Sequence, residues 1–127
     1  MSVQAAWLMA GLLFGHFLGD FTPLSTARMQ EAKAKGGPMG PILAHAAVHG
    51  LLVATVVAAI ARPAAAAVAG LAVYELATHF LLDAGRARLS LRLPPFRDPA
   101  RRPFWTLLGL DQFAHALVLV SIVAWLT

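Results

Sequence analysis

Long apolar runs, separated by polar or proline-rich stretches, dominate the chain. Four such runs cover residues 3–21, 41–61, 64–84 and 104–126. A helix rises about 1.5 Å per residue, so each run is long enough to cross roughly 30 Å of hydrocarbon. The connections between the runs are short. The pattern therefore predicts an all-α fold, with one membrane domain over residues 1–127 built as an up-down-up-down four-helix bundle.

The connecting segments carry the turn and loop signals. Residues 22–40 are polar and broken by prolines and glycines, and residues 26–35 within them predict a short interfacial helix capped by Ser25 or Thr26. Residues 62–63, an Arg-Pro pair, predict a tight turn. Residues 85–103 hold several prolines and arginines, so they predict a basic loop before the last run.

Composition and charge support a membrane location. The chain is 59% hydrophobic and 13% charged, whereas soluble domains are about half apolar and about a quarter charged. It has no cysteine, which excludes disulfides, thiolate metal sites and cysteine nucleophiles. The first and third connections hold nine Lys and Arg and the second holds one. This asymmetry predicts a multi-pass protein of the cell inner membrane with both termini outside.

Every apolar run contains ionisable residues spaced four apart, which places them on one face of a helix. Charges in such runs are costly and normally mark function. There are nine of these ionisable residues. Antiparallel packing of the helices would bring all nine to a similar depth, in the cytoplasmic half of the bundle. The deeper layer would hold His16, His49, Glu75 and His115. The shallower layer would hold Asp20, His45, Asp83 and Asp111, with His79 between the layers.

Imidazole and carboxylate together are the ligands of divalent transition metals. The predicted metal ligands are His16, Asp20, His45, His49, His79, Asp111 and His115. Zinc is the favoured ion, with iron, manganese, nickel and cobalt as alternatives. Nine groups exceed the three or four protein ligands of one zinc, so we expect one or two ions, with the other groups orienting the ligands. A metal-free proton path, a bis-histidine haem and a purely structural role stay open.

Several motifs together resemble a family of small bacterial integral membrane proteins known only as a domain of unknown function. The motifs are an opening His16-Phe-Leu-Gly-Asp20-Phe21, Lys33, the paired histidines of the second run, and an Asp111-Gln112…His115 ending. The resemblance covers nearly the whole chain and implies a membrane location without a settled activity. Members often carry a Gln after the Asp-Phe pair, where this chain has Thr22-Pro23-Leu24-Ser25. A looser similarity to membrane-bound metal-dependent hydrolases modestly raises the expectation that this protein is a hydrolase.

The leading hypothesis is a metal-dependent hydrolase that acts on a lipid or on a phosphoester or amide near the membrane. A bound metal would lower the pKa of water to about 7 and polarise the scissile group. Glu75 or Asp83 would serve as the general base, and Gln112, Lys33 and Arg28 would contact the substrate. The expected partners are membrane lipid and a lipid or small-molecule substrate, with no nucleic acid. Homo-oligomerisation, a metal-ion carrier and an accessory subunit stay open.

Overall fold

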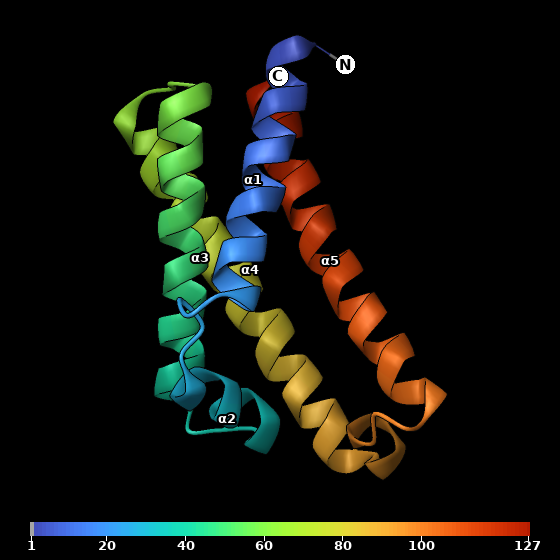
Figure 1. The fold of residues 1–127 in the computed structure, drawn as a ribbon. Helices are drawn as coiled ribbons and strands as arrows, with labels where there is room; N and C mark the ends of the chain where they lie inside the picture. Colours follow the sequence, from blue (N-terminus) through green and yellow to red (C-terminus); the bar gives the residue numbers. More distant parts are fainter. Residues whose placement is uncertain (1) are drawn as a thin grey trace.

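The computed structural model describes residues 2–127, and over this range the chain is all-helical, without a β-strand (Figure 1). The predicted all-α class is therefore confirmed. The elements are α1 (Val3–Phe21), α2 (Ala27–Lys35), α3 (Met39–Ile60), α4 (Ala65–Arg92), the short 3-10 helix η1 (Pro94–Arg97) and α5 (Arg102–Leu126).

Three helices, α3, α4 and α5, are long and apolar enough to cross a membrane. These three helices confirm the prediction of a membrane protein. In the described range α1 does not join this set, although it has 19 residues. It is less apolar because Gln4, His16 and Asp20 interrupt its hydrophobic run. The prediction of a fourth membrane-spanning helix therefore stays a prediction for α1.

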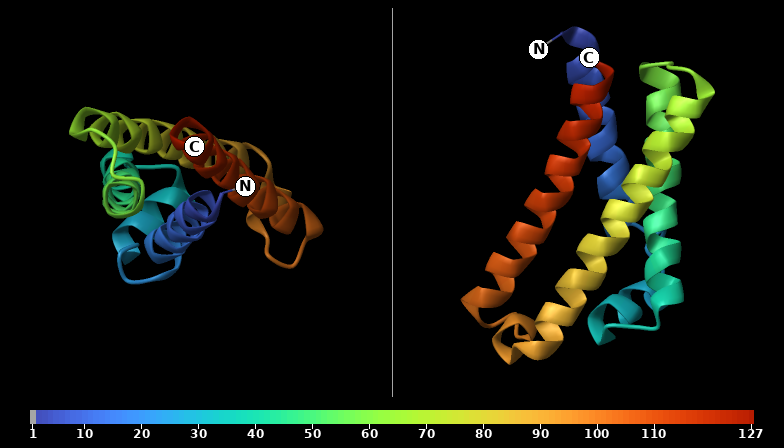
Figure 2. Two further views of the ribbon diagram at one scale, coloured as in Figure 1. Left: turned by 90° about the horizontal axis from the view of Figure 1, so that it is seen from above. Right: turned by 180° about the vertical axis from the view of Figure 1, so that it is seen from behind.

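The long helices pack side by side with alternating direction. α3 and α4 form the closest pair, α1 packs on α3, and α5 packs on α4 and α1. The two chain ends lie at the same end of the molecule, and α2 lies at the opposite end (Figure 1). Near the termini α1 and α5 lie together, and they diverge toward the start of α5 (Figures 1 and 2).

The apolar core occupies the end of the molecule that holds the termini. Its buried side chains come from all four long helices. They are Ala5, Leu8, Leu12, Val53, Val57, Leu71, Leu119, Ile122 and Val123. In every helix these residues lie on the terminal side of the ionisable residues. The ionisable residues therefore lie between an apolar layer and α2.

Two helix boundaries differ from the sequence prediction. The helix expected to end at residue 84 continues to Arg92, because no proline follows until Pro94. The predicted basic loop is therefore wrong over residues 85–92. α3 begins at Met39 and includes Pro41 in its first turn, where proline is tolerated because the N–H has no intrahelical partner there.

The short helix α2 forms where the sequence predicts it. The Thr26 side chain caps it by accepting a hydrogen bond from the Met29 amide at 3.3 Å. Gly36 ends it in the left-handed region, with φ 73°, and its N–H donates to the Ala32 carbonyl. On the exposed side the Lys35 ammonium lowers the pKa of the Glu31 carboxyl. α2 packs against α3 and α4, so its inner face covers the ionisable residues.

Candidate metal centre

The five histidines of the chain lie in one cluster centred on His79. The His79 ring stacks on the His49 ring with centroids 3.7 Å apart, and the His115 ring lies 4.1 Å away. The rings of His45 and His16 follow at 5.2 Å and 5.7 Å. α1, α3, α4 and α5 each contribute at least one of these rings. The four sequence-distant pairs therefore form one site.

Carboxylates connect the rings across helices. Asp83 places one oxygen 3.5 Å from His79 Nε2 and the other 3.6 Å from His115 Nε2. The Asp20 Oδ1 atom lies 3.0 Å from His45 Nε2 and 3.3 Å from His49 Nε2. All of these side chains are buried or nearly so. The cluster is therefore a dense set of nitrogen and oxygen donors shielded from solvent.

Three groups of these residues have ligand atoms within 4.8 Å of one another, which suits one metal ion per group. They are His16–His49–Glu75–His79, Asp20–His45–His49–His79, and His79–Asp83–His115. His79 belongs to all three. His115 groups with Asp83, and the predicted ligand Asp111 belongs to none of the three groups in residues 2–127.

Several donor atoms of the cluster are buried without a hydrogen-bond partner in the described range. They are His16 Nδ1, His49 Nε2, Glu75 Oε2, His79 Nε2, both Asp83 oxygens and His115 Nε2. Buried polar atoms normally have a partner, because leaving one unpaired costs about 1–3 kcal/mol. A divalent ion would satisfy several of them at once. Imidazole with carboxylate is also the donor set that zinc and the neighbouring transition metals accept.

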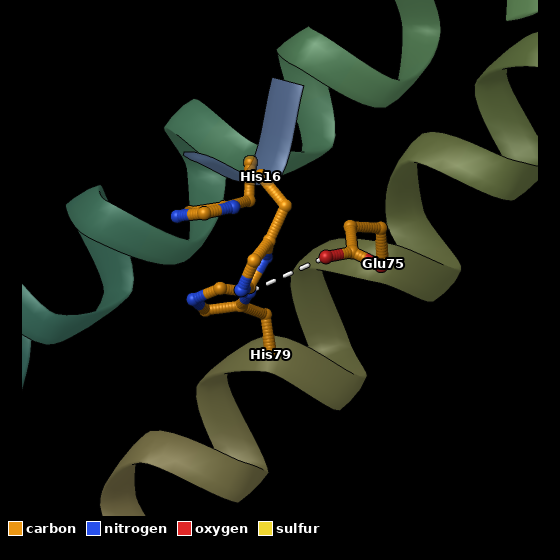
Figure 3. Close-up of side chains that lie close together, drawn as sticks. His16, Glu75 and His79 are labelled. Carbon is orange, nitrogen blue, oxygen red and sulfur yellow. Dashed lines mark hydrogen bonds and ion pairs between the residues drawn. The ribbon is translucent and has the colours of Figure 1, made fainter. Parts of the chain in front are cut away.

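Glu75 orients the central ring. Its Oε1 atom lies 3.3 Å from His79 Nδ1, one helical turn along α4. Figure 3 shows the Glu75 carboxylate directed at the His79 ring. The other ring nitrogen, Nε2, lies 3.5 Å from Asp83 Oδ2, so each nitrogen of the ring faces an acid of its own helix. Carboxylates commonly hold metal-binding histidines in this way.

Gln112 links α5 to α1 at the edge of the cluster. It donates to Asp20 Oδ2 at 3.2 Å and to Asp111 Oδ2 at 3.4 Å. Its carbonyl oxygen lies 3.3 Å from His16 Nε2, so Nε2 donates and His16 Nδ1 is left as the free acceptor. The sequence suggests a substrate contact for Gln112. The structure shows that it also holds Asp20 and His16 in place.

Lys33 reaches from α2 into the cluster. Its ammonium lies 3.1 Å from Asp83 Oδ2, 3.3 Å from His45 Nε2 and 3.8 Å from Asp20 Oδ1. Only 14% of the side chain is exposed. The other basic residue predicted on this helix, Arg28, is exposed and lies outside the cavity beside the cluster. α2 thus brings the positive charge of Lys33 to the site and leaves that of Arg28 in solvent.

A cavity of about 410 Å³ opens beside the cluster, on the side that α2 and η1 cover. Asp20, Asp83, Lys33 and Gln112 line it, as predicted site residues. Arg86 and Arg97 also line it, and the sequence prediction missed both. The signal for Arg86 was its place three residues after Asp83, on the same helix face. Arg97 gave no such signal, because it lies in a proline-rich segment.

A glycine allows the closest helix approach at the site. A Cβ atom on Gly19 would lie 2.4 Å from the His49 ring. Gly15 and Gly11, one and two turns earlier, face Leu52 and Val56 of α3. The three glycines therefore form a ridge of small residues that contacts α3 inside the molecule. It lets α1 carry His16 and Asp20 up to the rings of α3.

Comparison with known proteins gives a family but no activity. No curated protein and no solved structure matches the chain significantly. The model of one family, described as a protein of unknown function (DUF3307), matches residues 8–127. This range includes every residue of the cluster and cavity, and nothing in the match links the family to hydrolases. The chain belongs to the DUF3307 family of proteins of unknown function.

Proposed function

We propose that this protein is a membrane-embedded, metal-dependent hydrolase acting on a lipid or on a phosphoester or amide near the membrane. The observation that supports it most is the convergence of three ligand groups on His79 beside a cavity. The cavity gives a substrate a place next to the donors.

We assign the ion to the two four-residue groups that share His49 and His79. Zinc suits these groups best, because it binds four nitrogen or oxygen ligands in a tetrahedron. When the protein supplies three of the four, the last position is left for water or substrate. The Lys33 ammonium lies among Asp20, Asp83 and His45. The ammonium occupies the place that a second metal ion would need among these side chains. We therefore expect one metal ion per chain as long as Lys33 lies there.

The surrounding residues would divide the remaining tasks. A divalent ion would supply Lewis-acid polarisation and acidify water near the substrate. Asp83 is the better proton acceptor of the two predicted acids, because it lines the cavity that would hold the substrate. Glu75 lies away from the cavity lining and is held by His79. Gln112 and Lys33 would position the substrate beside Asp83.

In this proposal α1 is the fourth membrane span and completes a four-helix bundle in the inner membrane. The cost of His16 and Asp20 in α1 is offset by their contacts with α3 and α5. The segments at the α2 and η1 end hold nine Lys and Arg, against one at residue 62. The positive-inside rule then places the cavity at the cytoplasmic face and both termini outside.

A metal-ion carrier fits the structure less well. A carrier needs polar groups along a route to the far side. The core beyond the cluster is formed by apolar side chains only. The polar contact that borders it is the hydrogen bond between Tyr74 and Ser121, at 3.0 Å. The cluster therefore has an open side at the cavity and a closed side at the apolar core.

Metal content and hydrolysis of purified protein test the proposal. Wild type, stripped with chelator and reloaded with zinc in detergent, should retain about one zinc per chain. His79→Ala removes a ligand from all three groups and should lose the zinc. Asp83→Asn should retain zinc and lose hydrolysis of a phospholipid panel, because the amide cannot accept the proton. Metal content is read by elemental analysis of gel-filtered protein.

Glu31→Gln is the matched control, since Glu31 is an exposed acid on α2 outside the cluster. It should keep both zinc and hydrolysis. Full zinc occupancy in folded His79→Ala would overturn the metal centre. Zinc retention by wild type with no turnover of any lipid ester or amide would overturn the hydrolase and leave a metal-binding protein.

A further inference from the structure

The cavity beside the metal cluster has a cationic side that the metal ligands do not account for. Lys33 from α2, Arg86 from α4 and Arg97 from η1 all line it. Lys33 and Arg86 face carboxylates, with Arg86 Nη1 lying 3.2 Å from Asp111 Oδ2. Arg97 is exposed and has no ion pair or hydrogen bond from its side chain within residues 2–127, but unlike Arg28 and Arg88 it lines the cavity. The cavity lining thus has one exposed cation at its edge and two cations that a ligand can share with carboxylates.

The balance of charge in the lining favours an anion. Of its two carboxylates, Asp20 belongs to a ligand group to which the ion is assigned, and Asp83 lies 3.1 Å from the Lys33 ammonium, so both have a cation to balance them. Three basic side chains then face the cavity. Arg offers several N–H donors in a planar fork that matches the oxygens of phosphate. Ser90 and Gln30 add uncharged hydrogen-bonding groups to the same lining.

The other side of the cavity is apolar and leads toward the lipid-facing surface. Phe21 ends α1, Phe104 and Leu108 lie on the first turns of α5, and Phe96 lies on η1. Phe21 is 64% exposed, so it continues the surface that would face the membrane. α1 and α5 diverge at this level (Figures 1 and 2). A ligand with a hydrocarbon chain would lie along these apolar side chains of the cavity lining.

We propose that this cavity binds a phosphate monoester carried on an apolar chain, as in a phosphatidate-type lipid. The phosphate would lie between Arg97, Arg86 and Lys33, and the chain would follow Phe21, Phe104 and Leu108. A volume of about 410 Å³ is within the usual range for a small-ligand site of roughly 300–1,000 Å³. The inference deepens the proposed function by naming the substrate class, but binding itself does not require turnover.

The test is calorimetric titration of detergent-purified protein with dioctanoyl phosphatidate. Dioctanoylglycerol lacks the phosphate, and glycerol 3-phosphate lacks the chains. We expect phosphatidate to bind at least about 10-fold more tightly than either, because both halves of the cavity contribute. Arg97→Gln should weaken phosphatidate binding by roughly 10-fold or more, the effect of losing one charge-assisted contact.

Arg88→Gln is the matched control. It removes one arginine from α4 with the same change in net charge, and Arg88 is exposed and outside the cavity lining. Its affinity should equal that of wild type. Equal weakening in both variants would show a general charge effect and overturn the site. Tight binding of dioctanoylglycerol would overturn the phosphate contact, and equal binding of glycerol 3-phosphate would overturn the lipid source.

Titrations of zinc-free and zinc-loaded protein separate this inference from the proposed function. Phosphatidate binding that depends on Arg97, in a protein that retains no zinc, would support the cavity and overturn the metal centre. Zinc retention without phosphatidate binding would support the metal centre and overturn the cavity as a phosphatidate site. Stronger binding after zinc loading would support both, because the ion balances the charge of Asp20.

Discussion

At the scale of single residues, His79 has the central place in the site. Its ring touches the rings of two other helices, and its two nitrogens face different acids, Glu75 and Asp83. The sequence identifies His79 as a candidate because it lies four residues from each acid. It does not show that His79 is shared among the ligand groups, since that depends on how deeply each helix sits.

Gly19 supports the site by having no side chain. We expect Gly19→Ala to weaken zinc binding about 10- to 100-fold, the range typical for a disturbed ligand orientation. The added methyl group would meet the far end of the His49 ring and turn it away from the cluster. The chain should still fold, because that ring end can move. Zinc affinity is measured by competition with a chromogenic chelator.

Gly109→Ala is the control for this substitution, since a Cβ at Gly109 of α5 would meet open space. It should keep the wild-type affinity. Unchanged zinc binding in Gly19→Ala would mean that the His49 ring is not held against α1 and does not ligate the ion.

The candidate residues were predictable where helical spacing exposed them. Nine ionisable residues at steps of four in apolar runs were enough to find the cluster, because such residues are rare in membrane segments. The three-residue step from Asp83 to Arg86 was also visible, but arginine in a basic segment is normally a topology signal. Arg97 depends on the path of η1, which no periodicity describes.

At the scale of elements, α2 links the solvent side to the cluster. Thr26 and Gly36 fix its ends, and Lys33 lies on its inner face. The sequence predicted this helix from its caps alone. It did not predict that α4 would continue past the apolar run to Arg92, although that extension carries Arg86 and Ser90 to the cavity. The sequence prediction places the end of this helix where hydrophobicity falls, near residue 84. The helix instead ends at Arg92, two residues before Pro94.

Lys33 competes with metal for the acids of the cluster. We expect Lys33→Ala to raise zinc affinity by at least about 100-fold, since a unit charge about 4 Å away repels a cation by a few kcal/mol at an effective dielectric of about 20 and each 1.4 kcal/mol is about tenfold in affinity. Lys35→Ala removes an exposed charge on the same helix, whose partner is Glu31, and should have no effect. Chelator competition measures both. Weaker zinc binding in Lys33→Ala would show instead that Lys33 holds Asp20 and Asp83 in place.

At the scale of the whole molecule, one end is apolar and the other is basic. The apolar core lies near the two termini, and the cavity, α2 and η1 lie at the opposite end. The sequence could predict this polarity because charge and hydropathy vary along each helix in a regular way. It could not predict that α1 and α5 diverge, because that depends on which helix pairs pack closely.

The proposed topology is testable with single cysteines, since the chain has none of its own. Ala64→Cys lies in the connection between α3 and α4 and should react with an impermeant thiol reagent added outside intact cells. Arg28→Cys and Arg101→Cys lie at the basic end and should react only after the membrane is opened. All three positions are exposed. Labelling of Arg28→Cys and Arg101→Cys from outside would place the cavity on the outer face.

The polar contacts of α1 bear on how the chain is made. His45, which contacts Asp20, follows it by 25 residues, and Gln112, which contacts Asp20 and His16, follows them by 92 and 96 residues. When α1 leaves the ribosome, its charged face therefore has no partner on another helix, and its run is less apolar than those of α3, α4 and α5. We expect the nascent α1 to remain loosely inserted until α5 is synthesised. Stable insertion of α1 then depends on α5, and chains halted before Gln112 should be targets for membrane quality control.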